Sequence, residues 1–112
     1  MTTIDAAPIR TLNDRFRKDM DVSLGRWVIT RGVNDKGALF VQRACRAVRE
    51  FDQFNNGNDP HREHDFGRVT VDGETVLWKI DYYDPAFEFG SEDPSDPSKC
   101  RRVLTVMLAE EF

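Results

Sequence analysis

The sequence predicts an α+β fold of two layers, with two helices packed on one face of a mainly antiparallel four-stranded sheet in the order α-β-α-β-β-β. Three observations predict it. Two segments before residue 55 carry apolar residues at helical spacing, residues 69–83 read as a β-hairpin, and residues 102–109 read as a strand. A chain of 112 residues and 12.9 kDa fits one core, so we expect residues 1–112 to form a single domain.

The first helix and the first strand are predicted from short local patterns. Apolar residues recur at steps of three and four in the first segment: Ile9, Leu12, Phe16 and Met20. Asp5 is placed to cap this helix, and Pro8 is tolerated in its first turn. Residues 24–30 then predict a strand, because they are rich in aromatic and β-branched side chains.

A second, longer helix is predicted to start at a cap formed by Asn34 or Asp35. Its apolar positions share helical spacing: Phe40, Ala44, Ala47, Val48, Phe51 and Phe54. We expect this helix to end near Phe54, since the Asn-rich and Gly-containing residues 55–58 favour turns.

The hairpin is the clearest local signal in the chain. Asp72-Gly73 suits a type I′ turn, in which both central residues adopt positive φ, and this turn places Val69 opposite Val76. The predicted core face follows from that register: Val69, Val71, Val76, Trp78, Ile80 and Tyr82. The other face then carries mainly polar side chains: Arg68, Thr70, Thr75, Lys79, Asp81 and Tyr83.

The segment after the hairpin combines a long loop with a final strand. Residues 86–100 show no helical or strand pattern, which indicates either an ordered functional loop or a mobile one. Residues 102–109 are apolar on both alternations, which is typical of a strand in the interior of a sheet.

The formal net charge of −4 conceals an asymmetry along the chain. Residues 1–49 sum to +5, residues 50–98 to −10 and residues 99–112 to +1. This pattern indicates either neutralisation within the fold or two surfaces of opposite potential. The ordinary composition excludes a membrane span, a low-complexity disordered chain and a disulfide scaffold. Cys45 and Cys100 form no paired motif and no signal-peptide pattern is present, so we expect a protein of the reducing cytoplasm.

The densest polar stretch, residues 58–67, precedes the hairpin. Extending the hairpin register backwards places His64 opposite Asp81 and His61 opposite Asp84. Three interpretations follow. His64 and Asp65 anchor the Asn-rich loop to the hairpin, or the cluster binds a metal or performs acid–base chemistry, or the stretch is a binding surface. The spacing of the two histidines differs from that of the helical metalloprotease motif.

Several segments together resemble a bacterial family of small proteins known only as a domain of unknown function. They are TLNDRFR (11–17), NDPHREHDFG (58–67), WKIDYYDP (78–85), FGSEDPSDP (89–97) and RVLTVMLAEEF (102–112). The resemblance covers nearly the whole chain. It implies a stand-alone bacterial protein of a kind often found near plasmid or other mobile genes, and it implies no mechanism, because the family has no established activity.

We therefore expect a non-enzymatic binding or regulatory protein, in one specific form a mobile-element-encoded inhibitor of a host defence complex. The expected partner is a protein with a basic surface, with no cofactor and no membrane. The candidate contact surface consists of His61, Glu63, His64, Asp65, Asp81, Tyr83, Asp84, Glu88, Glu92, Asp93 and Asp96.

Two alternatives belong to other classes of function. One is a small metal-dependent or acid–base enzyme that uses His61, His64, Asp81 and Asp84. The other is a nucleic-acid-binding protein that uses the basic helices, with Arg43, Arg46 and Arg49 as its phosphate contacts. The acidic total charge disfavours the second alternative.

Overall fold

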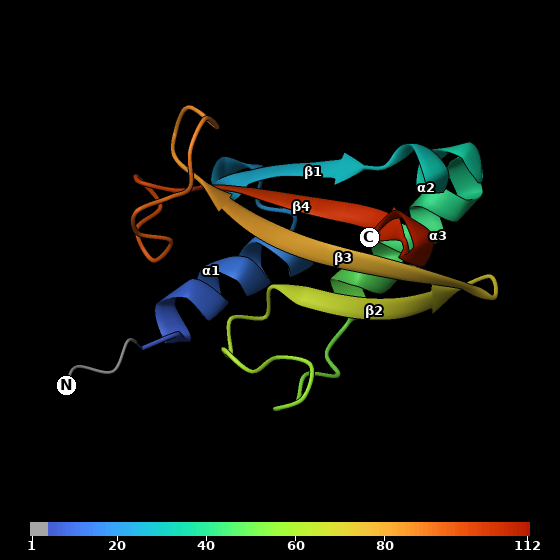
Figure 1. Cartoon of the computed structure of the whole chain (residues 1–112), viewed down its shortest axis with the longest axis horizontal. Coiled ribbons are helices and arrows are strands. Elements are labelled where there is room, and N and C mark those ends of the chain that lie inside the picture. Colours follow the sequence, from blue (N-terminus) through green and yellow to red (C-terminus); the bar gives the residue numbers. More distant parts are fainter. Residues whose placement is uncertain (1–4) are drawn as a thin grey trace.

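In a computed structural model, which describes residues 5–112, four strands form one sheet in the order β1-β4-β3-β2 (Figure 1). The strands are β1 (Gly25–Ile29), β2 (Phe66–Val71), β3 (Glu74–Tyr83) and β4 (Arg101–Leu108). The α-helices are α1 (Ala7–Lys18), α2 (Arg31–Asp35) and α3 (Ala38–Glu50), and short 3₁₀ helices cover Val22–Leu24 and Ala109–Glu111. The α+β class is therefore confirmed, with three α-helices in place of the two expected.

The sheet is mixed. β3 pairs antiparallel with both β2 and β4, whereas β1 pairs parallel with β4. The parallel pair arises because α3 carries the chain back across one face, so that β2 starts at the same end of the sheet as β1 (Figure 1). The chain reverses direction after β2 and again after β3, and β4 then lies between β3 and β1. As expected for a strand that is apolar on both sides, β4 lies in the interior of the sheet.

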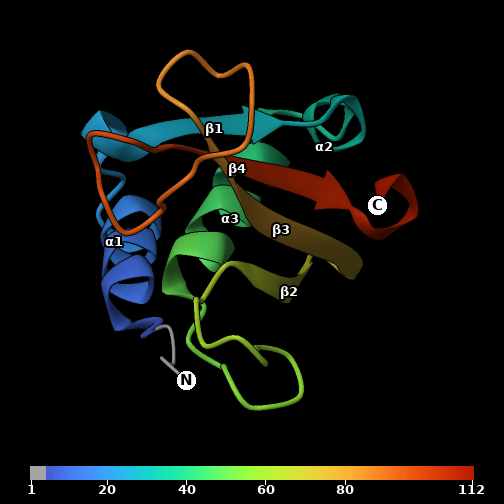
Figure 2. The same ribbon diagram turned by 60° about the vertical axis from the view of Figure 1, so that its left-hand side comes forward.

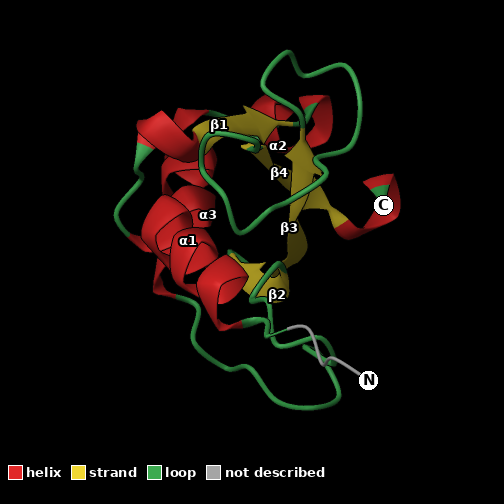
Figure 3. Cartoon of the chain, turned by 90° about the vertical axis from the view of Figure 1, so that its left-hand side faces the viewer, coloured by secondary structure: helices red, strands yellow, loops and turns green. Residues whose placement is uncertain are grey.

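Helices α1 and α3 lie side by side on one face of the sheet, and α2 lies beyond the end of β1 (Figures 2 and 3). The core between the layers contains Leu12 and Phe16 of α1, Phe40, Ala44 and Val48 of α3, and the inward side chains of all four strands. No helix within residues 5–112 is long and apolar enough to cross a membrane.

The predicted hairpin is confirmed in turn and register. Asp72 and Gly73 both adopt positive φ, at 50° and 80°, and Val69 pairs with Val76. The predicted core face is buried or half-buried, with Trp78 fully covered. Gly67 lies opposite Trp78, and a side chain at residue 67 would overlap the indole ring, so the sheet needs glycine there.

Three predicted helix boundaries are wrong: the end of α1 and both ends of α3. α1 ends at Lys18, and Met20 lies beyond it with positive φ and a partly exposed side chain. α3 begins after Gly37, without a side-chain cap, and ends at Glu50. Phe51 and Phe54 still pack against the core, but from the extended segment that follows α3. Apolar spacing alone does not distinguish a longer helix from an extended segment here, because both place the Phe51 and Phe54 rings against the core.

The short helix α2 was not expected from the sequence. Its first turn is capped by Glu111, whose carboxylate accepts hydrogen bonds from the Thr30 hydroxyl at 2.6 Å and from the Gly32 amide at 2.9 Å. The same carboxylate accepts the Leu108 amide at 2.8 Å. These three hydrogen bonds hold the pKa of Glu111 below its ordinary value and fasten the end of the chain to α2.

Candidate functional site

Two loops gather at the end of the sheet where β2 and β4 begin and β3 ends (Figures 1 and 2). We call residues 55–65, between α3 and β2, the histidine loop, and residues 84–98, which follow β3, the acidic loop. Together with the end of β3, these loops contain every residue of the predicted contact surface and of the predicted enzyme cluster, whereas the candidate phosphate contacts Arg43, Arg46 and Arg49 lie on α3. The N-terminal helix α1 lies beside the histidine loop and supplies the side chains that connect the two loops.

A buried polar chain links the loops through Asn13 and Arg102, both fully covered from solvent. The Arg102 Nε donates to Asn13 Oδ1 at 2.6 Å, and its Nη2 donates to the carbonyl of Pro94 in the acidic loop at 2.7 Å. Asn13 Nδ2 donates to the Glu63 carbonyl in the histidine loop at 2.9 Å. One asparagine and one arginine therefore fix both loops to the same helix and strand.

Tyr82 and Glu63 complete this network. The Tyr82 hydroxyl donates to Glu63 Oε1 at 2.7 Å and accepts from Asn13 Nδ2 at 2.8 Å. Burial, reinforced by the neighbouring Glu63 carboxylate, raises the pKa of the Tyr82 phenol far above its ordinary value, so the group remains a hydrogen-bond donor. Arg102 has no carboxylate within ion-pair distance among residues 5–112, and its guanidinium instead lies over the Tyr82 ring at 5.4 Å.

Arg17, also fully buried, supports the start of the histidine loop. Its Nη1 donates to three carbonyl oxygens at the end of α3: those of Val48 at 2.8 Å, Arg49 at 3.1 Å and Phe51 at 2.9 Å. The last carbonyls of a helix lack partners within the helix and carry its partial negative charge. Arg17 therefore ends α3 at the point from which the chain enters the histidine loop.

His64 is held between two aspartates. Its Nδ1 lies 2.8 Å from Asp14 Oδ1 on α1, its Nε2 lies 3.6 Å from Asp59 Oδ2, and its ring stacks on Phe54 with centroids 3.8 Å apart. The His64 backbone amide also donates to Asp59 Oδ1 at 3.2 Å. These contacts attach the histidine loop to α1, which is an anchoring role like the one expected, although with different partners.

The expected cluster of His61, His64, Asp81 and Asp84 is not assembled. The antiparallel ladder stops after the Ile80 amide donates to the Asp65 carbonyl, because His64 turns out of the strand with φ of 54°. His61 is exposed, and Asp81 pairs with Lys79 at 2.8 Å. Within residues 5–112, no group of three or more His, Cys, Asp or Glu side chains is arranged to hold a metal ion.

Asp65 and Tyr83 contact other parts of the fold at the end of the hairpin. Asp65 is half-buried, and burial, together with the nearby Glu63 carboxylate, raises the pKa of its carboxyl group. Tyr83 pairs with Gly90 in an isolated bridge and lies near the Phe87 ring, with centroids 6.5 Å apart. Both residues thus position the two loops at the end of the hairpin.

The acidic loop is ordered by hydrogen bonds between its own residues. The carboxylates of Asp93 and Asp96 accept from the amides and hydroxyls of Ser95 and Ser98, which forms two consecutive turns. Asp84 Oδ1 accepts the Glu88 amide at 2.9 Å. The hydrogen bonds from Ser98 hold the pKa of Asp96 below its ordinary value, so this carboxyl group is ionised at neutral pH.

The acidic loop contains five carboxylates and no Lys or Arg: Asp84, Glu88, Glu92, Asp93 and Asp96. Of these, only Glu92 has a described cation within ion-pair distance, Lys99 at 3.8 Å. An aromatic side chain, Phe89, stands among them and is 71% exposed. The loop is therefore a concentrated negative surface with an apolar residue at its centre.

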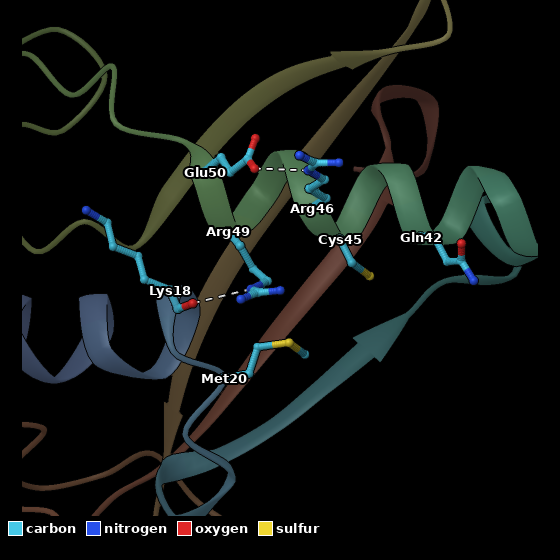
Figure 4. Close-up of a pocket in the computed structure, with 7 residues that line it drawn as sticks. All are labelled: Lys18, Met20, Gln42, Cys45, Arg46, Arg49 and Glu50. Carbon is cyan, nitrogen blue, oxygen red and sulfur yellow. Dashed lines mark hydrogen bonds and ion pairs between the residues drawn. The ribbon is translucent and has the colours of Figure 1, made fainter.

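The basic residues of α3 have partners, unlike most carboxylates of the acidic loop. Arg43 pairs with Asp72 and Arg46 with Glu50, each at 3.0 Å, and Arg49 Nε donates to the Lys18 carbonyl at 3.3 Å. A cavity of about 410 Å³ lies between this helix and the end of α1, with Met20 and Cys45 on its wall (Figure 4). Burial raises the pKa of the Cys45 thiol, which favours its protonated form.

Sequence reasoning missed Asn13, Asp14, Arg17 and Arg102. A signal was present for two of them: Asn13 and Arg17 are four residues apart and lie on the same side of α1 as Ile9 and Phe16. Polar residues on the apolar side of a helix predict a buried hydrogen-bonded network. Arg102 had no comparable signal, because it stands at the start of a strand where an exposed charge is common.

These features define a class: a small two-layer α+β protein whose polar loops are fastened together at one end of a mixed sheet. Residues 29–111 match the family described as Protein of unknown function (DUF3768), and the chain belongs to that family. Membership in a family of unknown function, expected from the motifs, is thereby confirmed. No curated protein and no solved structure matches the chain.

Proposed function

We propose that this protein binds a partner protein with a basic surface through the acidic loop. The observation that carries the proposal is the arrangement of residues 84–98, where the exposed Phe89 stands among five carboxylates on an ordered backbone, and only Glu92 has a cation partner among residues 5–112. A negative surface attracts a basic partner and accelerates its association. An exposed aromatic side chain supplies the apolar contact that dominates many interfaces.

Order in the loop favours binding because a surface that is already in its bound conformation loses little conformational entropy on association. The two Asp-Ser turns and the hydrogen bond from Arg102 to the Pro94 carbonyl supply this order. The charge distribution is also uneven. Arg43–Asp72 and Lys36–Glu74 neutralise the opposite end of the hairpin, whereas no ion pair from another element within residues 5–112 reaches the acidic loop.

An inhibitor of a host defence complex is the specific form of this function that we favour. A small protein that presents a dense negative surface is able to occupy a basic groove that otherwise receives a phosphate backbone. The support is the charge of the loop and its position at an exposed end of the fold. Binding of a partner, rather than turnover of a substrate, is the activity proposed.

The test compares capture of bacterial lysate proteins by the wild-type chain and by Glu88→Gln/Glu92→Gln. These two side chains are suited to the test because Asp93 and Asp96 also hold the loop turns, so replacing the aspartates would change both charge and shape. We expect the double variant to lose most of a salt-sensitive partner, about tenfold or more in recovered amount, when each carboxylate contributes about 1 kcal/mol.

The matched control is Asp35→Asn/Glu110→Gln, which removes the same charge at the opposite end of the sheet (Figure 1). This control is expected to retain the partner. Equal recovery by the wild-type protein and the acidic-loop variant, or equal losses in both variants, would contradict the proposed surface.

A further inference from the structure

A second site lies on the side of the histidine loop that faces α1. A cavity of about 200 Å³ is lined there by the ring of Phe54 and six polar residues: Arg10, Arg62, His64, Asn55, Asn56 and Asp59. Ligand pockets for drug-sized molecules are about 300–1,000 Å³, so this cavity is matched to a small polar group. Its lining is dominated by hydrogen-bond donors.

The two arginines are free to engage a ligand. Arg10 Nη1 donates to the Arg62 carbonyl at 3.1 Å, which holds the Arg10 side chain against the loop. Neither guanidinium forms an ion pair with a carboxylate among residues 5–112, whereas Arg15, Arg31, Arg43 and Arg46 all do. Two uncompensated guanidinium groups therefore line one small cavity.

The carboxylates near the cavity are already engaged. Asp14 contacts His64 Nδ1 and lies 3.5 Å from Arg17 Nη2, and the buried Asp59 accepts the His64 amide. Asp59 is thus turned toward the loop that it supports. Asp59 also lines the cavity, but it faces His64, so neither Arg10 nor Arg62 has an ion-pair partner among residues 5–112.

His64 and the asparagines add oriented groups. Because Asp14 fixes Nδ1 and Phe54 fixes the plane of the ring, the cavity side of the imidazole is held in one orientation. Asn55 Oδ1 accepts hydrogen bonds from the Gly57 and Asn58 amides, and its side-chain nitrogen has no acceptor among residues 5–112. Arg62 and His64 both adopt positive φ, at 57° and 54°. Residues other than glycine rarely adopt this backbone conformation.

We propose that this cavity binds a phosphate group. A phosphate carries up to two negative charges and several acceptor oxygens, which match two guanidinium groups better than the single charge of a carboxylate does. The cavity exceeds the volume of one water, about 30 Å³, several times over, which is enough space for a phosphate and its immediate substituent. The phosphate belongs either to the free ion or to the end of a phosphomonoester. This site is separate from the acidic loop and does not depend on its function.

The test is a titration followed by NMR of the labelled protein, with inorganic phosphate in one arm and phenyl phosphate in the other. Sodium acetate and sodium chloride at matched ionic strength and pH serve as reference salts. We expect saturable shifts confined to the resonances of Asn55, Asn56, Arg62 and His64. Saturation by both phosphates assigns the site to the phosphate group itself, and saturation by phenyl phosphate alone assigns it to a phosphomonoester.

The variant Arg10→Gln/Arg62→Gln is expected to weaken phosphate binding at least tenfold, because it removes both cations and retains polar side chains. Arg31→Gln/Arg68→Gln removes two exposed arginines elsewhere and is expected to bind as the wild-type protein does. An unchanged spectrum outside the loop verifies that each variant is folded. The proposal is overturned by shifts that do not saturate, by equal shifts with acetate or chloride, or by undiminished binding in the first variant.

Discussion

Replacing Arg17 with methionine is expected to lower the free energy of unfolding by about 3–5 kcal/mol, the cost of removing one member of a buried charged network. Methionine fills much of the same space but donates no hydrogen bond, so the carbonyls of Val48, Arg49 and Phe51 lose their shared donor. The guanidinium also lies 4.9 Å from the Trp78 ring centroid, a contact that is lost with the charge.

Urea denaturation followed by Trp fluorescence measures this loss. Arg15→Met is the matched control, because Arg15 lies on the same helix and makes only a partly exposed ion pair with Asp21. The control is expected to cost less than about 1 kcal/mol. If the two variants were equally stable, Arg17 would not be the residue that stabilises the end of α3.

Replacing Asn13 with leucine is expected to cost about 2–4 kcal/mol, because it leaves buried polar groups of Arg102 and Glu63 without their partner. The result specific to this variant is expected in the two loops. Although residue 13 lies on α1, amide hydrogen exchange is expected to accelerate in both the histidine loop and the acidic loop, since Asn13 connects Glu63 with Arg102 and, through it, with Pro94.

Hydrogen exchange measured by mass spectrometry resolves the two loops as separate peptides. Thr11→Leu places the same side chain at an exposed position of the same helix and is expected to leave both loops unchanged. Faster exchange confined to one loop, or spread evenly over the whole chain, would contradict the coupling through Asn13.

The parts of the fold that were predictable depend on local chemistry. The Asp-Gly turn and the alternation of apolar and polar residues around it were sufficient to predict the hairpin, its register and its core face. The predicted register continues from the turn to the pair Phe66–Lys79. The interior position of β4 followed from its apolar residues on both sides. The α+β class followed from these elements together with the helical spacing of the two earlier segments.

The features that were missed depend on partners far apart in the chain. α2 begins where Glu111 caps it, and α3 ends where Arg17 donates hydrogen bonds to its last carbonyls. Neither contact leaves a local pattern in the sequence. The parallel pairing of β1 with β4 joins residues more than seventy positions apart, for example Gly25 with Arg102. Helical spacing across Phe51 and Phe54 also predicted too long a helix, because an extended segment buries the same rings.

In the candidate site, too, contacts between residues far apart in the chain were missed. The histidine loop and the acidic loop were both predicted to be functional segments, and the structure places them at one end of the sheet. The pairing of His64 with Asp81 failed, because residue 64 leaves the strand and meets Asp14 of α1 instead. The register of a hairpin cannot be extended through a residue whose backbone turns, and the sequence alone did not mark that turn.

The most direct measurement of the proposed function is photo-crosslinking in bacterial cells with a benzophenone analogue of phenylalanine placed at residue 89. Phe112 is the matched position, since it is 77% exposed compared with 71% for Phe89 and lies outside the acidic loop, with its ring centroid 6.0 Å from that of Phe66. We expect a discrete crosslinked product from residue 89 that weakens when Glu88→Gln/Glu92→Gln is added, and no such product from residue 112. Crosslinking from residue 112 alone, equal crosslinking from both positions, or none from residue 89 would contradict binding through the acidic loop.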